Sequence, residues 1–238
     1  MYRERPVTLP SSSEPVTQIW GAIPERTSWP HKKMTTISSV LCHDIPIMID
    51  LADSRALIFD CDGTLVDTPP VYARAWAKGF LPFGREMPTA WYLDRAGMSE
   101  HVLIDAFESD FDVKVDREET VKIMRQAFLD EIDALGEITH IARIARENHG
   151  KRRMAVASGG SRAIVTASLK ATGLDALFET VVTLDDVAHP KPAPDLFLEA
   201  ARRLGTDPAH CIVFEDSQQG LEAARRAGMR EIDVADIR

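Results

Sequence analysis

The sequence has little cysteine, no excess of basic residues and no long apolar run, and each absence excludes a class of protein. Three cysteines, Cys42, Cys61 and Cys211, are too few and too odd in number for a disulfide framework. The net charge of −9 argues against a nucleic-acid-binding protein, which carries a basic face. No apolar run is long enough to span a membrane, and the N-terminal residues 1–6 lack the apolar core of a signal peptide. We therefore expect a cytoplasmic protein without nucleic-acid or membrane partners.

The overall composition is that of a globular protein. Hydrophobic residues make up 45% of the 238 residues and charged residues 27%. This length allows one large domain, or a domain with a smaller one inserted. A small anionic ligand would need a metal ion and local basic groups to overcome the negative charge.

Residues 1–50 differ from the remainder in being rich in Pro, Ser and Thr without sustained periodicity. We predict a flexible N-terminal extension there, although Trp20 and Trp29 could dock onto the body of the protein.

Regular alternation of short apolar runs and helical patterns begins at Ala56. The expected strands are Ala56–Asp60, Arg153–Ser158, Glu179–Thr183, Cys211–Asp216 and Glu231–Val234. The expected helices, each followed by a glycine suited to a C-terminal cap, are Arg162–Thr172, Pro194–Leu204 and Ser217–Ala227. This pattern predicts the α/β class, with a Rossmann-like, doubly wound parallel sheet covered by helices.

The interval between the first two strands is too long for a single crossover. Amphipathic helical spacing occurs within it at Val71–Lys78, Ser99–Phe107 and Glu118–Ile132. We therefore predict a helical cap over residues 69–138, inserted after the first strand into a core of residues 51–68 and 139–238. An insertion there would lie above the strand end, where open α/β sheets bind ligands.

Two aspartates, Asp60 and Asp62, end the first apolar run and are followed at once by Gly63. In an extended chain, residues two apart share a face, so both carboxylates would point the same way. A divalent cation would relieve their repulsion. Cys61 would point to the opposite face, where a buried apolar role is expected.

Three further segments follow predicted strands. Ser158 and Gly159 open a helix and suit a phosphate group, although such a start is usually only a turn and cap. Lys191, fixed between prolines, could meet a phosphate or screen carboxylates, or could be a solvated loop lysine. Glu215 and Asp216 offer the oxygen ligands that Mg²⁺ requires, although Asp216 or Ser217 could merely cap the next helix.

Together these four segments resemble the motifs of the haloacid dehalogenase superfamily, in the family's order, across roughly residues 50–238. The sequences Lys-Pro-Ala-Pro-Asp from residue 191, Glu-Asp-Ser from 215 and Ala-Gly-Met at 227–229 resemble the β-phosphoglucomutase-like branch, which includes sugar-phosphate phosphatases. The resemblance implies a Mg²⁺-dependent phosphatase that acts on a small phosphorylated sugar or related metabolite.

The resemblance also implies a role for each matching residue. Asp60 would be the nucleophile that forms an aspartyl-phosphate, and Asp62 would protonate the leaving alcohol and then activate water. Mg²⁺ would be held by Asp60, the backbone carbonyl of Asp62, and Asp216. Glu215 would be a further ligand or a neighbour of the ligands. The residues expected to hold the phosphate oxygens are Ser158, the Gly159 N–H and Lys191.

Two positions favour hydrolysis over a mutase reaction. Tyr72 stands where the mutase has a histidine, and Glu100 stands where it has an arginine for the distal phosphate. Four basic residues of the insertion are possible substrate contacts, although each is more typical of an exposed charge on a helix: Arg74, Arg95, Lys122 and Arg125. A β-phosphoglucomutase-type mutase and a non-catalytic phospho-ligand sensor are the alternatives, and we expect a monomer or weak dimer.

Overall fold

A five-stranded parallel sheet forms the centre of the structure, a computed structural model that describes residues 49–237. The strands are β1 (Ala56–Phe59), β2 (Arg153–Ala157), β3 (Thr180–Val182), β4 (Cys211–Glu215) and β5 (Arg230–Asp233). Their spatial order is β3-β2-β1-β4-β5, with all neighbouring pairs parallel. The predicted α/β fold class is confirmed, with strand ends that differ by at most one residue from those expected.

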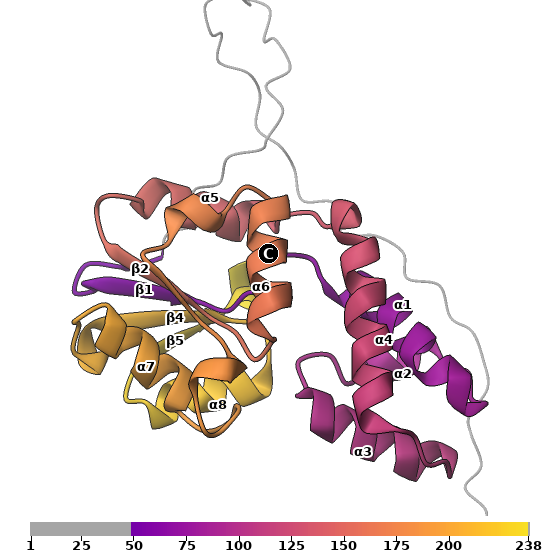
Figure 1. Ribbon diagram of the computed structural model, residues 1–238. Helices are drawn as coiled ribbons and strands as arrows, with labels where there is room; N and C mark the ends of the chain where they lie inside the picture. Colours follow the sequence, from indigo (N-terminus) through magenta and orange to yellow (C-terminus); the bar gives the residue numbers. More distant parts are fainter. Residues whose placement is uncertain (1–48, 238) are drawn as a thin grey trace, which may run out of the picture. The chain divides into compact units, whose positions relative to one another are not determined.

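Helices cover both faces of this sheet. Helices α5 (Thr139–Asn148) and α6 (Arg162–Ala171) lie on one face, and α7 (Asp195–Arg203) and α8 (Gln218–Arg226) lie on the other (Figure 1). Alternate residues of β1 serve the two layers, because Leu57 and Phe59 pack in the first hydrophobic cluster, whereas Ala56 and Ile58 pack in the second. The central strand is therefore buried on both faces.

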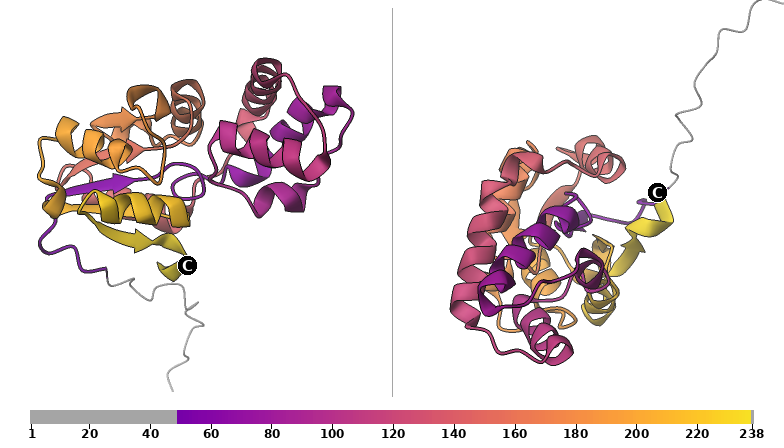
Figure 2. Two further views of the ribbon diagram at one scale, coloured as in Figure 1. Left: turned by 90° about the horizontal axis from the view of Figure 1, so that it is seen from below. Right: turned by 90° about the vertical axis from the view of Figure 1, so that its right-hand side faces the viewer.

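The first four of the five α-helices between β1 and β2 form a group that we call the helical insertion. They are α1 (Pro69–Phe80), α2 (Thr89–Leu93), α3 (Glu100–Phe111) and α4 (Arg117–Asp130). They surround a hydrophobic cluster of their own, in which the rings of Phe80 and Phe107 stack with centroids 3.7 Å apart. Figure 2 shows the insertion as a group of helices beside the end of the sheet.

Short 3₁₀-helices make several of the connections. They are Leu81–Phe83, Ile132–Ala134, Asp175–Leu177, Leu184–Asp186, Pro208–His210 and Val234–Ile237.

The three glycines expected to end helices of the core do so. Gly173, Gly205 and Gly228 follow α6, α7 and α8 with φ of 68°, 58° and 71°. In each case the next residue donates a backbone hydrogen bond to a carbonyl of the last helical turn, which completes a left-handed cap.

The predicted extension over residues 1–50, with Trp20, Trp29 and Cys42, lies outside the described residues except at its end. There Ile49 packs against the core, and Arg230 donates to the Asp50 carbonyl at 2.7 Å. Cys61 is fully buried in the first core cluster, as expected. Within residues 49–237, none of the helices combines the length and apolarity that a membrane span requires.

Candidate active site

Acidic side chains gather where the two central strands end. Asp60 directly follows β1, Glu215 is the last residue of β4, and Asp216 follows it. The strands are in parallel register with Phe59 opposite Phe214, and the Asp60 N–H donates to the Phe214 carbonyl at 2.9 Å. Residues 155 positions apart are thereby brought together at one edge of the sheet.

Asp60, Glu215 and Asp216 form the carboxylate cluster, in which one oxygen from each lies within 4.8 Å of the others. Gly63 makes this approach possible, because a Cβ there would lie 2.3 Å from Oδ2 of Asp216. The Thr64 hydroxyl orients Asp216 by donating to its Oδ1 at 3.1 Å.

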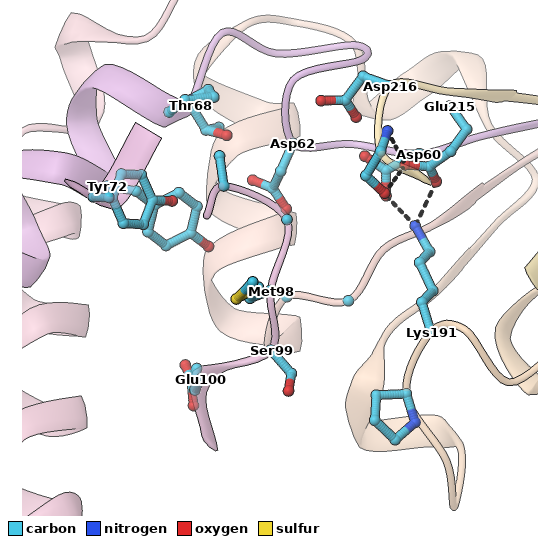
Figure 3. Close-up of a pocket in the computed structure, with 18 of the residues that line it drawn as sticks. Asp60, Asp62, Thr68, Tyr72, Met98, Ser99, Glu100, Lys191, Glu215 and Asp216 are labelled. Carbon is cyan, nitrogen blue, oxygen red and sulfur yellow. Dashed lines mark hydrogen bonds and ion pairs between the residues drawn. The ribbon is translucent and has the colours of Figure 1, made fainter. Parts of the chain in front are cut away.

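Lys191 pairs with this cluster and is not a solvated loop lysine. Its side chain is only 7% exposed, and its Nζ donates to Asp60 Oδ1 at 2.5 Å and to Glu215 Oε2 at 2.7 Å (Figure 3). The other Glu215 oxygen accepts from the N–H and the hydroxyl of Ser217 at 3.0 and 2.7 Å. Both Glu215 oxygens are thus engaged, which fixes Lys191 beside Asp60.

The cluster and Lys191 together contain more carboxylates than cations, and the pKa values of Asp60, Asp216 and Lys191 are raised. Burial, and then the charge of Glu215, raise the pKa of Asp60 well above its usual range and that of Asp216 to about 6. Burial would lower the pKa of Lys191, but Asp60 and Glu215 outweigh it and raise that pKa. Three carboxylates against one ammonium leave an excess of negative charge and hard oxygen donors, which is a donor set that fits a divalent cation.

Asp62 lies in the same pocket but has a different environment. The Ser158 hydroxyl donates to Asp62 Oδ2 at 2.9 Å and accepts from the Gly160 N–H at 3.0 Å. Burial raises the pKa of Asp62, and the hydroxyls of Thr68 and Ser158 partly offset the rise. Asp62 Oδ1 and the Thr68 hydroxyl oxygen are both buried, and neither has a hydrogen-bond partner of normal geometry among the described residues. The Asp62 carboxylate is not part of the carboxylate cluster.

Asp60 and Asp62 lie just beyond the end of the first strand. β1 ends at Phe59, and the Asp60–Asp62 segment enters a turn in which the Leu65 and Val66 N–H groups donate to the Cys61 carbonyl. Asp60 and Asp62 nevertheless line the same pocket, as expected, whereas Cys61 between them is in the core.

The pocket combines the sheet edge with the helical insertion and encloses about 80 Å³, which suits a small ligand. Gly159 contributes from the predicted phosphate loop, and Tyr72 and Glu100 contribute from the insertion. Among the lining residues that the sequence analysis did not single out are Thr68 and Tyr92. Ser217, expected as a possible helix cap, also lines the pocket, and its hydroxyl accepts from the Gly220 N–H and so caps α8.

The four basic residues of the insertion considered as possible substrate contacts pair with carboxylates of the insertion itself. Their partners are, in order, Glu131 for Arg74, Asp110 for Arg95, Glu119 for Lys122 and Glu100 for Arg125. Among the described residues that line the pocket, Lys191 is the only cation.

Comparison of the sequence with known proteins identifies the family of the chain. Residues 57–234 match the haloacid dehalogenase-like hydrolase family. The chain belongs to this family. Among its haloacid dehalogenase-like relatives is the fructose-1-phosphate phosphatase YqaB of Escherichia coli (strain K12), 36% identical over 182 residues that cover 75% of this chain and 95% of the relative. The phosphorylated carbohydrates phosphatase of Thermotoga maritima is 28% identical, over 75% of this chain and 83% of its own length.

The fold agrees with the same family. The crystal structure of CbbY from Rhodobacter sphaeroides in complex with phosphate has a TM-score of 0.68 and 26% identity, and covers 76% of this chain and 85% of its own. The chain is thus a hydrolase of phosphoric monoesters.

Proposed function

We propose that this protein is a Mg²⁺-dependent phosphatase that hydrolyses a small phosphorylated sugar or related metabolite through an aspartyl-phosphate on Asp60. The observation that carries the proposal is the buried Asp60 carboxylate, held by Lys191 within the carboxylate cluster and open to the pocket. The relatives named as phosphatases of fructose 1-phosphate and of phosphorylated carbohydrates support the substrate class.

Two carboxylates would divide the chemistry. Asp60 would attack phosphorus, and the bond from phosphorus to the sugar oxygen would break as Asp62 gives that oxygen its proton. Asp62 would then take a proton from a water that attacks phosphorus, and the bond to Asp60 would break. The raised pKa of Asp62 supports this role, because an acid must still hold its proton near neutral pH.

The other polar groups of the pocket would bind either the metal ion or the phosphate. The donor set fits Mg²⁺ held by Asp60, the Asp62 carbonyl and Asp216. Bound Mg²⁺ would offset the repulsion between the Asp60 carboxylate and the phosphoryl oxygens. Ser158, the Gly159 N–H and Lys191 would hold those oxygens, and Glu215 would keep Lys191 in position, since hydrogen bonds occupy both its oxygens.

The helical insertion would act as a cap. We assign residues 69–138 to it and residues 51–68 and 139–238 to the catalytic core. The presence of Tyr72 and Glu100 in the pocket supports this assignment, because both come from the insertion and could contact a substrate bound at Asp60.

Hydrolysis is favoured over a mutase reaction by the charge of the insertion's side of the pocket. A bisphosphate that turns over within the site needs a cation at each end, and Lys191 provides only one. At the other end is Glu100, whose carboxylate would repel a phosphate.

The test is a phosphate-release assay with Mg²⁺ across a panel of sugar phosphates, run beside an isomerisation assay with β-glucose 1-phosphate. We expect rapid phosphate release and little isomerisation, and loss of nearly all turnover in a folded Asp60→Asn variant. Fast isomerisation with little free phosphate would favour the mutase, and binding without turnover would favour a sensor. Retained hydrolysis in Asp60→Asn would refute the assignment of the nucleophile.

A further inference from the structure

The pocket contains an acidic side chain that the proposed chemistry does not use. Glu100 is the first residue of α3 and lies on the side of Tyr72, away from Lys191 (Figure 3). Arg125 of α4 donates from Nε to Glu100 Oε1 at 3.0 Å and from Nη2 to Oε2 at 2.8 Å. A bidentate pair of this kind fixes the plane of the carboxylate, so its position in the pocket is set before a ligand binds.

Arg125 itself is kept out of the pocket. Glu100 lines the cavity, whereas Arg125 is not among its lining residues. The hydrogen bonds and charge of Glu100, with a smaller contribution from the charge of Asp185, raise the pKa of Arg125. Arg125 would have to leave Glu100 to reach a substrate. This end of the pocket therefore presents carboxylate oxygens, each with a lone pair that Arg125 does not use.

We propose that Glu100, held by Arg125, determines specificity: it accepts hydrogen bonds from hydroxyl groups of a sugar monophosphate and repels a second phosphate. The inference rests on the proposed phosphatase function and adds the residue that would select a monophosphate over a bisphosphate. An ionised carboxylate can only accept hydrogen bonds, and sugar hydroxyl groups can donate them. A second phosphate would instead bring negative charge toward a partly buried anion, which is unfavourable. Arg125 is then a positioning residue, because it acts through Glu100.

The test uses the full chain with Mg²⁺ and three substrates. They are the best sugar monophosphate of the panel, the bisphosphate of the same sugar, and p-nitrophenyl phosphate, which has no sugar hydroxyls. Glu100→Gln keeps the side-chain size and removes the charge. We expect kcat/KM for the monophosphate to fall about tenfold, mainly through KM, because hydrogen bonds to a charged group are lost. The bisphosphate should be hydrolysed faster than by the wild type, and p-nitrophenyl phosphate at an unchanged rate.

Two further variants separate this role from a structural one. Arg125→Gln frees Glu100 and should weaken monophosphate hydrolysis in the same direction. Glu131→Gln is the matched control, because Glu131 also binds two cations of the insertion, Arg74 and Lys78, but lies outside the pocket. It should leave all three substrates unchanged. Thermal melting checks that each variant is folded.

Several outcomes would overturn the inference while the phosphatase stands. One is an unchanged ratio of monophosphate to bisphosphate hydrolysis in Glu100→Gln, and another is a wild type that hydrolyses p-nitrophenyl phosphate but no sugar monophosphate. A wild type that prefers the bisphosphate, and loses this preference in Arg125→Gln, would show that Arg125 grips phosphate instead. Absence of Mg²⁺-dependent hydrolysis of p-nitrophenyl phosphate by the wild type would refute the proposed function itself.

Discussion

Lys191 shows how one buried residue sets the charge of the whole pocket. Its ammonium contacts two of the three carboxylates of the cluster and lies 5.1 Å from the ring centroid of Phe197, so it is held on several sides. A lysine in this position cannot neutralise three carboxylates. The remaining negative charge is what a divalent cation would balance, and a phosphate would then bind against that cation and Lys191.

Gly63 provides a prediction for a single residue. Its φ is +82°, and a Cβ there would collide with Asp216, whereas Gly84 has a φ of +76° with nothing within 4 Å of its added Cβ. Both alanine variants should lose about 1 kcal/mol of unfolding free energy from the left-handed backbone. Only Gly63→Ala should also displace Asp216 and require more Mg²⁺ for half-maximal phosphate release.

Urea unfolding and Mg²⁺ titration of activity measure these two effects. Equal Mg²⁺ requirements in Gly63→Ala and Gly84→Ala would contradict the assignment of Asp216 to the metal.

Single residues also mark the limit of what the sequence predicts. Asp60, Ser158 and Lys191 follow recognisable strand ends, so their meeting at one edge of a parallel sheet could be expected. Thr68 and Tyr92 could not, because their place in the pocket depends on how the helical insertion packs, which no short motif encodes. The pairing of Arg125 with Glu100 depends in the same way on the packing of α3 beside α4.

At the scale of elements, Asp186 joins β3, α6 and α7. It accepts from the N–H and hydroxyl of Thr183 at 2.8 and 3.1 Å, from Arg203 at 2.8 Å, and from Arg162. Burial would raise the pKa of Asp186, but the hydrogen bonds of Arg203 and Thr183 lower it to about 2. The carboxylate thus ties the end of one strand to the helices on both faces of the sheet.

This pKa gives a pH-dependent prediction. A carboxylate whose pKa is lower in the folded state stabilises the fold above its unfolded pKa of about 3.9, and this contribution is lost as pH falls through about 2. Asp186→Asn should therefore cost about 2 kcal/mol of unfolding free energy at pH 7 and about half as much at pH 3. Urea unfolding at the two pH values measures it, and a difference that does not shrink at pH 3 would contradict the role of the charge.

The elements differ in how well the sequence predicts them. α6, α7 and α8 lie within a residue of the expected ends, since an apolar stripe and a following glycine mark them. The five-residue α2 was not predicted, because so short a helix has too few turns to show a period and depends on tertiary packing. α5 was also missed, although Ile141 and Ala145 bury one of its faces.

At the scale of the whole molecule, the site joins segments from Asp60 to Asp216, so metal binding should stabilise the complete fold. After treatment with EDTA, the protein should lose phosphatase activity and regain it with Mg²⁺. Saturating Mg²⁺ should raise the Tm by about 5 °C or more, because an ion that binds only the folded state increases the free energy of unfolding.

Asp216→Asn should abolish this rise, whereas Asp175→Asn should keep it, since Asp175 is exposed and lies outside the pocket. Thermal melts with and without Mg²⁺ measure both. A full rise in Asp216→Asn would place the ion elsewhere.

The central claim is that Asp60 carries the phosphoryl group, and mass spectrometry of the acid-quenched enzyme tests it most directly. Asp62→Asn should slow hydrolysis of the intermediate more than its formation from p-nitrophenyl phosphate, so this variant should accumulate it. We predict one added phosphoryl group on the peptide that contains Asp60, and none when Asp60→Asn is combined with it. A phosphoryl group on another residue, or steady turnover that leaves Asp60 unmodified in every quenched sample, would contradict the account.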